Sequence, residues 1–433
     1  MTFATYTLGC KVNQYETEAV SEIMVKRGYK SVPFDCCADI YIINTCSVTA
    51  AADAKNRNVI RQAFRKNPSA VIVVTGCYGQ SAGEKLIDVE GVSIVTGTNN
   101  RSEIPDMIER YLMTGEKILK ADAVDFHSMD YEDLSVDTIT GHTRAFVKIQ
   151  DGCTQFCSYC IIPFTRGAQR SRSLTDLKSE IERLADAGYK EIVLTGINMT
   201  SYGRDLKDGT DLVSAVETVA SVEGIMRVRF SSLEPMYFTE ETIAKLSNID
   251  KFCRHFHLAI QSGSDSVLKR MNRHYTTEDF LKITETVRKY MPDSAFTTDI
   301  MVGFPGETDE EHKESMNFAR KIGFSRMHVF PYSRRQGTVA DKMKDQVPPN
   351  VKKARAKEMG ELAFELKEEF TKSLYGTIQD VLLEEYVPGK GMKGFASNYC
   401  EVIAKDCTAK RQGDIVKVLI TGSEGDICLG ETV

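Results

Sequence analysis

The 433-residue sequence lacks three features that would place it in a membrane, outside the cell or on nucleic acid as a generally basic protein. Its longest apolar stretches, such as residues 70–75, are far shorter than the roughly 20 residues that span a bilayer, so we expect no transmembrane helix and no membrane partner. The first residues show no basic segment followed by an apolar one, and we expect a cytoplasmic protein without a secretory signal. The net charge of −6 excludes a globally basic nucleic-acid binder but not local basic patches.

The composition is that of a folded protein with several domains. Hydrophobic residues make up 42% and charged residues 27%, which excludes a mainly disordered chain. At about 150 residues per domain, the length suggests about three domains. The sequence also has twelve cysteines. In a reducing cytosol, metal ligation or catalysis explains that number better than disulfides do.

Residues 1–118 alternate short apolar runs with amphipathic helical patterns and predict a flavodoxin-like parallel α/β domain. We expect strands at 4–8, 39–43, 71–75 and 92–95, and helices at 15–27, 49–66, 83–88 and after residue 101. Cys10, Cys46 and Cys77 each follow one of the first three strands, and parallel strands end at one sheet edge. Three thiolates there suit an iron–sulfur cluster with one open iron. Ordinary buried cysteines at strand ends are the alternative.

A second group of cysteines follows an acidic segment. Residues 119–140 are interpreted as a solvated linker, because residues 122–137 carry six carboxylates and no lysine or arginine. Cys153, Cys157 and Cys160 then form a C-x3-C-x2-C loop after an expected strand. Three thiolates can hold three irons of a four-iron cluster and leave the fourth iron open. A zinc site completed by a distant ligand, such as Cys253 or a histidine, is the alternative.

Residues 141–348 contain six strand-like runs separated by helical patterns, which predicts a partial (β/α)6 TIM barrel with its site at the C-terminal strand ends. The expected strands cover 145–149, 191–195, 227–231, 255–260, 297–302 and 327–331. Asn198, Glu234, Gln261 and Asp299 lie at or just after these strand ends and are candidate binding residues. Helix capping and turn formation are the alternative for each of them.

The three-cysteine loop, with Tyr159 directly before its last cysteine, resembles that of the radical S-adenosylmethionine enzymes. In that family the open iron of a [4Fe-4S] cluster chelates the methionine moiety of S-adenosylmethionine, and an electron from the cluster generates a 5′-deoxyadenosyl radical. The resemblance implies that Cys153, Cys157 and Cys160 hold this cluster. It also implies that Tyr159 packs near the adenine and makes Asn198, Glu234, Gln261 and Asp299 candidates for cofactor binding.

Longer stretches resemble one family of these enzymes, the methylthiotransferases. They run in family order from Thr7 to Thr338 and include TLGCKVNQYE, NTCSVTAAADAKNRNV, TGCYGQ, DGCTQFCSYCIIPFTRG, LTGINMTSYG, HLAIQSGSD, DIMVGFPGETDEE and HVFPYSRRQGT. The resemblance implies two [4Fe-4S] clusters, the second held by Cys10, Cys46 and Cys77 with an open iron that carries the sulfur to be inserted. It further implies S-adenosylmethionine as methyl and radical source, an electron donor and a sulfur donor.

Substrate choice divides the methylthiotransferases. The segment CKVNQYE at residues 10–16 resembles the branch that modifies N6-threonylcarbamoyladenosine beside the anticodon of tRNA, as do residues 49–53 and 232–235. We therefore expect a transferase that inserts a 2-methylthio group into that nucleoside. The alternatives are the isopentenyladenosine branch, an enzyme acting on an aspartate of a ribosomal protein, and a non-catalytic iron–sulfur or zinc protein that binds RNA.

The remaining chain predicts a connecting helix at 349–375 and a small β-barrel at 376–433. By position the barrel resembles the RNA-binding TRAM domain that ends methylthiotransferases, although it carries six cations against nine carboxylates. Arg166, Arg170 and Arg172 follow the cluster loop, and we expect them to contact phosphates of the tRNA anticodon stem-loop. A second basic run, on the helix at 49–66, is interpreted as a solvated face.

Overall fold

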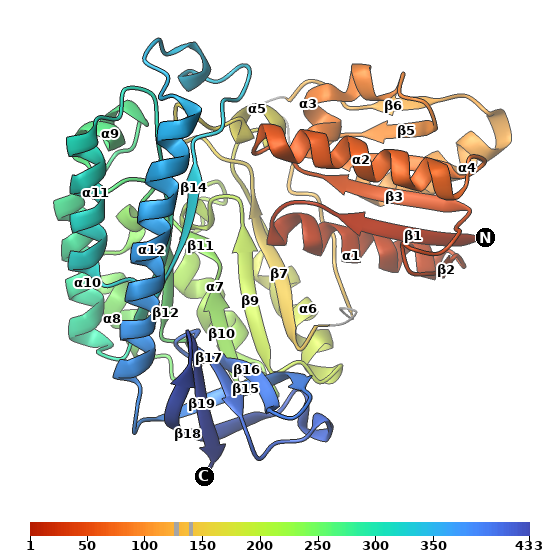
Figure 1. Cartoon of the computed structure of the whole chain (residues 1–433). Coiled ribbons are helices and arrows are strands. Elements are labelled where there is room, and N and C mark those ends of the chain that lie inside the picture. Colours follow the sequence, from red (N-terminus) through yellow and green to blue (C-terminus); the bar gives the residue numbers. More distant parts are fainter. Residues whose placement is uncertain (125–129, 138–141) are drawn as a thin grey trace.

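The computed structural model describes residues 1–124, 130–137 and 142–433. An N-terminal α/β domain lies beside a central open barrel, and a small β-barrel closes the lower end (Figure 1). The long helix α12 (Pro349–Ser373) lies along strand β14 (Arg326–Pro331) and leads into the small barrel. Among the residues described, no helix is long and apolar enough to cross a membrane.

The N-terminal sheet is entirely parallel and has the strand order β2-β1-β3-β4-β5-β6. Its strands are β1 (Thr2–Thr7), β2 (Lys30–Ser31), β3 (Ile40–Thr45), β4 (Val71–Gly76), β5 (Val92–Thr96) and β6 (Ile118–Lys120). Every residue of β3 and β4 is buried, because helices cover both faces of the sheet. The order 2-1-3-4-5 is that of the flavodoxin-like fold, which confirms the predicted fold class.

The helices of this domain begin at the C-terminal ends of the strands. They are α1 (Lys11–Lys26), α2 (Ala50–Lys66), α3 (Cys77–Leu86) and α4 (Ile104–Thr114). Helices α1 and α3 begin several residues earlier than the apolar periodicity predicts. In α3 the reason is a kink at Ala82, which joins a first turn starting at Cys77 to the predicted segment. Cys10 and Cys77 therefore lie at helix starts.

The acidic segment differs from the solvated linker that the sequence predicts. In its described part, the Glu132 carboxylate accepts a hydrogen bond from Arg101 at 2.8 Å. Leu134 and Val136 are buried in the central core, and the Val136 amide donates to Glu180 at 2.9 Å. Because Leu134 and Val136 are apolar and buried, this part of the segment packs at the contact between the two domains and is not a solvated linker. Residues 125–129 and 138–141 of the predicted linker lie outside the described residues.

The central domain has the six predicted strands as parallel neighbours. They are β7 (Arg144–Asp151), β9 (Glu191–Gly196), β10 (Arg227–Phe230), β12 (His255–Leu258), β13 (Ala295–Val302) and β14. They form two sheets, β10-β9-β7-β8 and β11-β12-β13-β14, joined by a parallel bridge between Val228 and Phe252. The short β8 (Arg170–Ser171) pairs antiparallel with β7, and β11 (Ser232–Leu233) lies beside β12. This arrangement confirms the predicted open barrel of six strands.

Helices cover the outside of the open barrel. They are α6 (Leu174–Asp186), α7 (Leu212–Ser221), α8 (Glu240–Ser247), α10 (Thr277–Tyr290) and α11 (Asp309–Ile322), with shorter α5 (Ile162–Arg166) and α9 (Asp265–Arg270). Their buried faces join the strands in one core that extends from Tyr15 in α1 to Leu366 in α12.

The C-terminal strands close into a five-stranded barrel in the order β15-β16-β17-β19-β18. They are β15 (Ile378–Val387), β16 (Gly391–Ala396), β17 (Glu401–Ala404), β18 (Ile415–Glu424) and β19 (Ile427–Thr432). Strand β16, with the sequence GMKGFA, has no strong apolar alternation and was not predicted. Cys400, Cys407 and Cys428 are buried in the core of this barrel.

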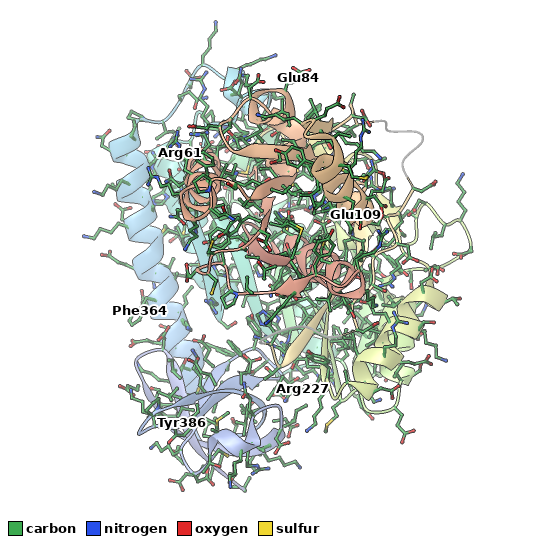
Figure 2. All side chains as sticks on the ribbon, turned by 90° about the vertical axis from the view of Figure 1, so that its right-hand side faces the viewer. Arg61, Glu84, Glu109, Arg227, Phe364 and Tyr386 are labelled. Atoms are coloured by element: carbon green, nitrogen blue, oxygen red, sulfur yellow. The ribbon has the colours of Figure 1, made fainter. Side chains whose placement is uncertain are left out.

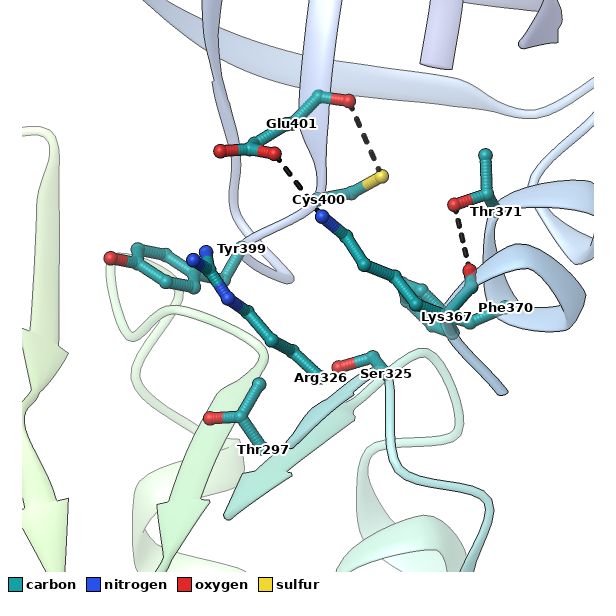
Figure 3. Close-up of a pocket in the computed structure, with 9 residues that line it drawn as sticks. All are labelled: Thr297, Ser325, Arg326, Lys367, Phe370, Thr371, Tyr399, Cys400 and Glu401. Atoms are coloured by element: carbon teal, nitrogen blue, oxygen red, sulfur yellow. Dashed lines mark hydrogen bonds and ion pairs between the residues drawn. The ribbon is translucent and has the colours of Figure 1, made fainter. Parts of the chain in front are cut away.

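The small barrel is fixed to the central domain by charged side chains. Arg229 of β10 donates to the carbonyls of Ser397 at 2.9 Å and Ala396 at 3.1 Å, and Arg227 lies at the same junction (Figure 2). Lys367 of α12 binds Glu401 at 3.3 Å (Figure 3). The pocket drawn in Figure 3 has a volume of about 10 Å³, the lower limit for one water molecule, so it is a packed junction.

Candidate active site

Three cysteines meet at the C-terminal edge of the N-terminal sheet. Cys10 is the N-cap residue of α1, Cys46 follows β3 directly, and Cys77 is the first residue of α3 after β4. Strands β1, β3 and β4 are adjacent in the sheet. Burial, together with the neighbouring thiols of Cys77 and Cys10, raises the pKa of the Cys46 thiol to about 11. The fold thus gathers the three thiols that the sequence places at strand ends.

Two residues hold these loops close together. Gly9 has φ of +114°, and a Cβ atom there would lie 2.9 Å from the Cβ atom of Cys46. Only glycine lets the two loops approach this closely in that backbone conformation. The buried Asn13 side chain donates to the carbonyl of Leu8 at 2.8 Å and to that of Thr45 at 3.0 Å. Asn13 therefore ties the Cys10 loop to the Cys46 loop.

The second group of thiols lies on the loop that follows β7. Cys153 accepts a hydrogen bond from the Gln155 amide at 3.5 Å, and its sulfur lies 3.8 Å from the Asn198 side-chain nitrogen. Burial, together with neighbouring thiols, raises the pKa of Cys153 to about 11 and that of Cys160 to about 12. Metal-free thiols in this state are protonated at neutral pH, so metal loading must release protons.

Arg273 holds the third sulfur of this loop. Its Nη1 atom donates to the Cys157 sulfur at 3.3 Å, and Nη2 binds the Glu234 carboxylate at 2.8 Å. The Arg273 side chain is only 4% exposed. Neither Arg273 nor Asn13 was identified from the sequence, because nothing in the local pattern marks an arginine 113 residues beyond Cys160 as its neighbour.

The donor chemistry fits iron–sulfur clusters. Each group offers three thiols and no fourth cysteine, which suits a four-iron cluster with one open iron. Across the described residues, no three cysteine, histidine or acidic side chains converge as ligands of one metal ion would. A four-iron cluster binds each thiolate through a different iron, so such convergence is not required. The predicted zinc alternative needs convergence on one ion and finds no support.

Of the predicted cofactor residues, Tyr159, Asn198 and Glu234 lie near the second group of thiols. Tyr159 packs edge-on against Phe304, with ring centroids 6.4 Å apart. Asn198 lies beside Cys153, and Glu234 is held by Arg273 near Cys157. Gln261 has φ of +67°, and within the described chain its buried side-chain oxygen has no hydrogen-bond partner.

Asp299 lies deeper in the barrel than the other candidates. Its carboxylate binds the His257 imidazole at 3.3 Å. Burial would raise the pKa of Asp299, but His257 and the more distant His328 lower it.

The three arginines predicted to contact RNA lie inside the protein. Arg166, Arg170 and Arg172 are 0%, 3% and 2% exposed. Arg166 binds Asp151 at 2.9 Å, Arg170 binds the same carboxylate at 3.5 Å, and Arg172 binds Glu180. Because these guanidiniums already pair with buried carboxylates, they do not face an RNA backbone, and we do not propose them as RNA contacts. The basic run on α2 is exposed, and Arg61 lies at its surface (Figure 2).

Arg166 instead connects the two groups of thiols. It follows the cluster loop in sequence, and its Nε atom donates to the Cys77 sulfur of the other domain at 3.4 Å. Its guanidinium also binds Glu16 at 2.9 Å and the Asn13 side-chain oxygen at 2.8 Å. Burial would raise the pKa of Glu16, but Arg101, Arg166 and Lys148 lower it to about 2. The sequence predicted that Arg166 lies near the site, but it did not indicate which groups the Arg166 side chain contacts.

Comparisons with known proteins agree with this geometry. Residues 147–319 match the radical SAM superfamily, and residues 2–97 match the uncharacterized protein family UPF0004. In solved structures, the chain resembles the radical S-adenosylmethionine methyltransferase TsrM of Kitasatospora setae, with cobalamin and a [4Fe-4S] cluster bound. The TM-score is 0.54 at 14% identity, covering 76% of this chain and 74% of that one, which shows a shared fold.

Curated relatives cover nearly the whole chain. The threonylcarbamoyladenosine tRNA methylthiotransferase MtaB of Bacillus subtilis strain 168 is 43% identical over 97% of this chain and 93% of its own length. MtaB of Aquifex aeolicus is 35% identical over 97% of this chain and 100% of its own. The tRNA-2-methylthio-N(6)-dimethylallyladenosine synthase of Clostridium tetani is 38% identical over 88% and 85%. The chain therefore belongs to the radical S-adenosylmethionine methylthiotransferase family.

Proposed function

We propose that this protein is a tRNA methylthiotransferase that inserts a 2-methylthio group into N6-threonylcarbamoyladenosine next to the anticodon. The observation that carries the proposal is the 43% identity to MtaB of Bacillus subtilis along 97% of the chain, together with both groups of three thiols. The isopentenyladenosine relatives match a smaller share of the chain, 88% in the case of Clostridium tetani.

Family membership implies one [4Fe-4S] cluster and S-adenosylmethionine. We assign this cluster to Cys153, Cys157 and Cys160. When bound, the cluster and its cofactor supply the radical that activates the substrate C–H bond. Hydrogen bonds from Arg273 and Asn198 orient two of the proposed ligand sulfurs. Tyr159, Glu234 and the unpartnered oxygen of Gln261 are available to hold the cofactor, and Asp299 lines the space below it.

A second [4Fe-4S] cluster is proposed for Cys10, Cys46 and Cys77. Three thiols again leave one iron free to carry the sulfur that is transferred. The Arg166 guanidinium beside Cys77 places a positive charge at this site. Because Arg166 also binds Asp151 of β7, it fixes this edge against the domain that holds the first cluster.

Partners follow from the reaction. Reduction of the first cluster requires an electron donor, and replacement of the transferred sulfur requires a sulfur donor. The RNA partner is the tRNA anticodon stem-loop. We propose that the C-terminal barrel contributes to RNA binding. This proposal rests on the resemblance of the barrel to the TRAM domain of the family, because the net charge of the barrel does not favour nucleic acid.

The experiment that tests this function is mass spectrometry of nucleosides from total tRNA of cells with and without the gene. We expect the methylthio form of N6-threonylcarbamoyladenosine to disappear in the deletion strain while its unmodified parent accumulates. Complementation with the wild-type gene should restore it, and complementation with Cys157→Ala should not.

Two other results would redirect the assignment. Loss of a methylthio-isopentenyladenosine would move the protein to the branch of the Clostridium tetani relative. Unchanged tRNA nucleosides would overturn the tRNA function and favour the ribosomal-protein branch.

A further inference from the structure

The side chain of Lys11 points from the N-terminal domain into the open barrel. Lys11 follows Cys10 directly and is the first residue of α1. Its half-buried Nζ atom lies 5.7 Å from the ring centre of Phe146 on β7. The charges that act on it come from Glu191 of β9, Arg229 of β10 and Arg144 of β7. An ammonium group thus lies between the Cys10, Cys46 and Cys77 edge and the barrel interior.

Polar side chains line the barrel interior that Lys11 faces. His257 binds Thr297 at 2.9 Å and Asp299 at 3.3 Å, and His255 binds the same threonine at 2.8 Å. Tyr399 of the small barrel stacks on His255 with ring centroids 4.7 Å apart. The proposed cofactor and sulfur sites leave the charge of Lys11 without a role.

The other cations and anions of this region already have partners. Arg144 binds Glu384 at 2.7 Å, Arg229 binds Glu191 at 2.9 Å, and Asp299 binds His257. In residues 1–124, 130–137 and 142–433, Lys11 has no carboxylate within 4.0 Å and no hydrogen-bond acceptor. A partly buried ammonium group without an anion is costly unless a ligand supplies one.

The potential around Tyr399 shows that this space is electropositive. Burial would raise the pKa of the Tyr399 hydroxyl, yet Lys11, Arg144 and Arg229 lower it below its ordinary value. The guanidiniums of Arg144 and Arg229 lie over the Tyr399 ring, 5.5 Å and 4.9 Å from its centre. A phenol whose ionised form is favoured lies in a field that attracts an anion.

We propose that Lys11, assisted by the Tyr399 hydroxyl, binds the carboxylate of the N6-threonylcarbamoyl group of the substrate. This inference rests on the proposed function. In the modified adenine, C2 receives the sulfur and N6 carries the threonylcarbamoyl group, and Lys11 directly follows Cys10 of the proposed sulfur site. Threonylcarbamoyl ends in a carboxylate, whereas an isopentenyl group is an uncharged hydrocarbon that leaves the ammonium unpaired. Lys11 is thus a residue that determines substrate specificity.

The test measures binding by the full-length, cluster-loaded protein under anaerobic conditions. Fluorescence anisotropy compares three anticodon stem-loop RNAs that carry N6-threonylcarbamoyladenosine, its carboxamide analogue without the negative charge, or plain adenosine. We expect the wild type to bind the carboxylate RNA about tenfold more tightly than the carboxamide RNA, as for one charge-assisted pair. Lys11→Gln should bring this ratio close to one and leave the affinity for the carboxamide RNA unchanged.

Two further variants sharpen the result. Tyr399→Phe keeps the stacked ring and removes one hydroxyl, so it should reduce the ratio by a smaller factor. Lys30→Gln removes an exposed lysine from the edge strand β2 and should retain the wild-type ratio. Cluster content measured by absorbance should be the same in all variants, because none of these residues is a proposed ligand.

Several outcomes overturn the inference. Lys11→Gln with the wild-type ratio shows that another residue binds the carboxylate. An equal loss of affinity for all three RNAs assigns Lys11 to a phosphate. A wild type that does not distinguish carboxylate from carboxamide shows that the carboxylate is not bound. The proposed function is judged separately, by methylthio product formed from the carboxylate RNA with the same wild-type preparation.

Discussion

At the scale of the residue, the chemistry depends on sulfur atoms whose thiolate form must be favoured. Buried thiols with pKa values of about 11 and 12 at Cys153 and Cys160 are poor ligands until a metal displaces their protons. Arg273 donates a hydrogen bond to the Cys157 sulfur, and Arg166 donates one to the Cys77 sulfur. Each group of thiols has its own arginine, and each arginine is anchored by a carboxylate.

The two groups of thiols should be separable by single substitutions. Cys157→Ala removes a proposed ligand of the radical-generating cluster, so production of 5′-deoxyadenosine should fall to background. Cys46→Ala removes a proposed ligand of the proposed second cluster, so methylthiolation should stop while some cleavage of S-adenosylmethionine continues. Chromatography of reaction products measures both, with Cys407→Ala in the small-barrel core as the control. Equal loss of cleavage in both cluster variants would contradict the division of roles.

At the scale of the element, helix α11 illustrates how local sequence and tertiary contacts combine. Thr308 caps the helix in a capping box with Glu311, as the sequence GETDEE predicts. The structure adds Arg270 of α9, which binds Glu311 at 2.6 Å. Burial would raise the pKa of Glu311, but hydrogen bonds from Arg270, Ser266 and the Thr308 amide lower it to about 2.

This pKa shift predicts a pH dependence of stability. A carboxyl group whose pKa is lowered on folding stabilises the protein fully above its unfolded value and loses that contribution as pH falls toward the folded value. Between pH 7 and pH 3, the wild type should therefore lose about 2 kcal/mol of stability that Glu311→Gln does not lose. The difference in the free energy of unfolding between the two proteins should shrink by that amount. Urea unfolding of the metal-free proteins measures this. The exposed neighbour Glu310 provides the control variant Glu310→Gln, and a constant difference for Glu311→Gln would refute the prediction.

At the scale of the whole molecule, buried charges join the N-terminal and central domains. Glu16 of α1 binds Arg101 at 3.0 Å, Lys148 at 3.3 Å and Arg166 at 2.9 Å, and Asp151 of β7 completes the network. All five side chains are at most 2% exposed. Removing one member of such a network leaves an uncompensated buried charge, whose cost is far larger than that of a surface pair.

Arg166→Met should therefore destabilise the metal-free protein by about 3–5 kcal/mol. Urea unfolding gives the free energy, and hydrogen exchange should show faster opening of α1 along its contact with β7. Arg61→Met, on the exposed face of α2, serves as the matched control and should change stability by at most about 0.5 kcal/mol. A loss below about 1 kcal/mol for Arg166→Met would show that the domains are held together without this network.

The sequence by itself determined the strands, their parallel arrangement and the cysteines at their ends. Apolar runs such as Val71–Gly76 and the helices between them leave few ways to pair, so Cys10, Cys46 and Cys77 had to meet at one edge. The three-cysteine motif at residues 153–160 could also be recognised from the sequence, because its cysteines are close together in the chain. Features without local periodicity were missed, among them strand β16 and the buried part of the acidic segment around Leu134.

Only the tertiary structure decided which charged side chains face a ligand and which face each other. Arg166, Arg170 and Arg172 follow the cluster loop in sequence, yet the packing of α1 against β7 turns them toward Glu16, Asp151 and Glu180. Lys11 resembles any other lysine in the sequence, and its missing partner becomes visible only when the surrounding carboxylates are found to be occupied. Charge pairing depends on distances between residues far apart in the chain, and only packing of the complete fold sets those distances.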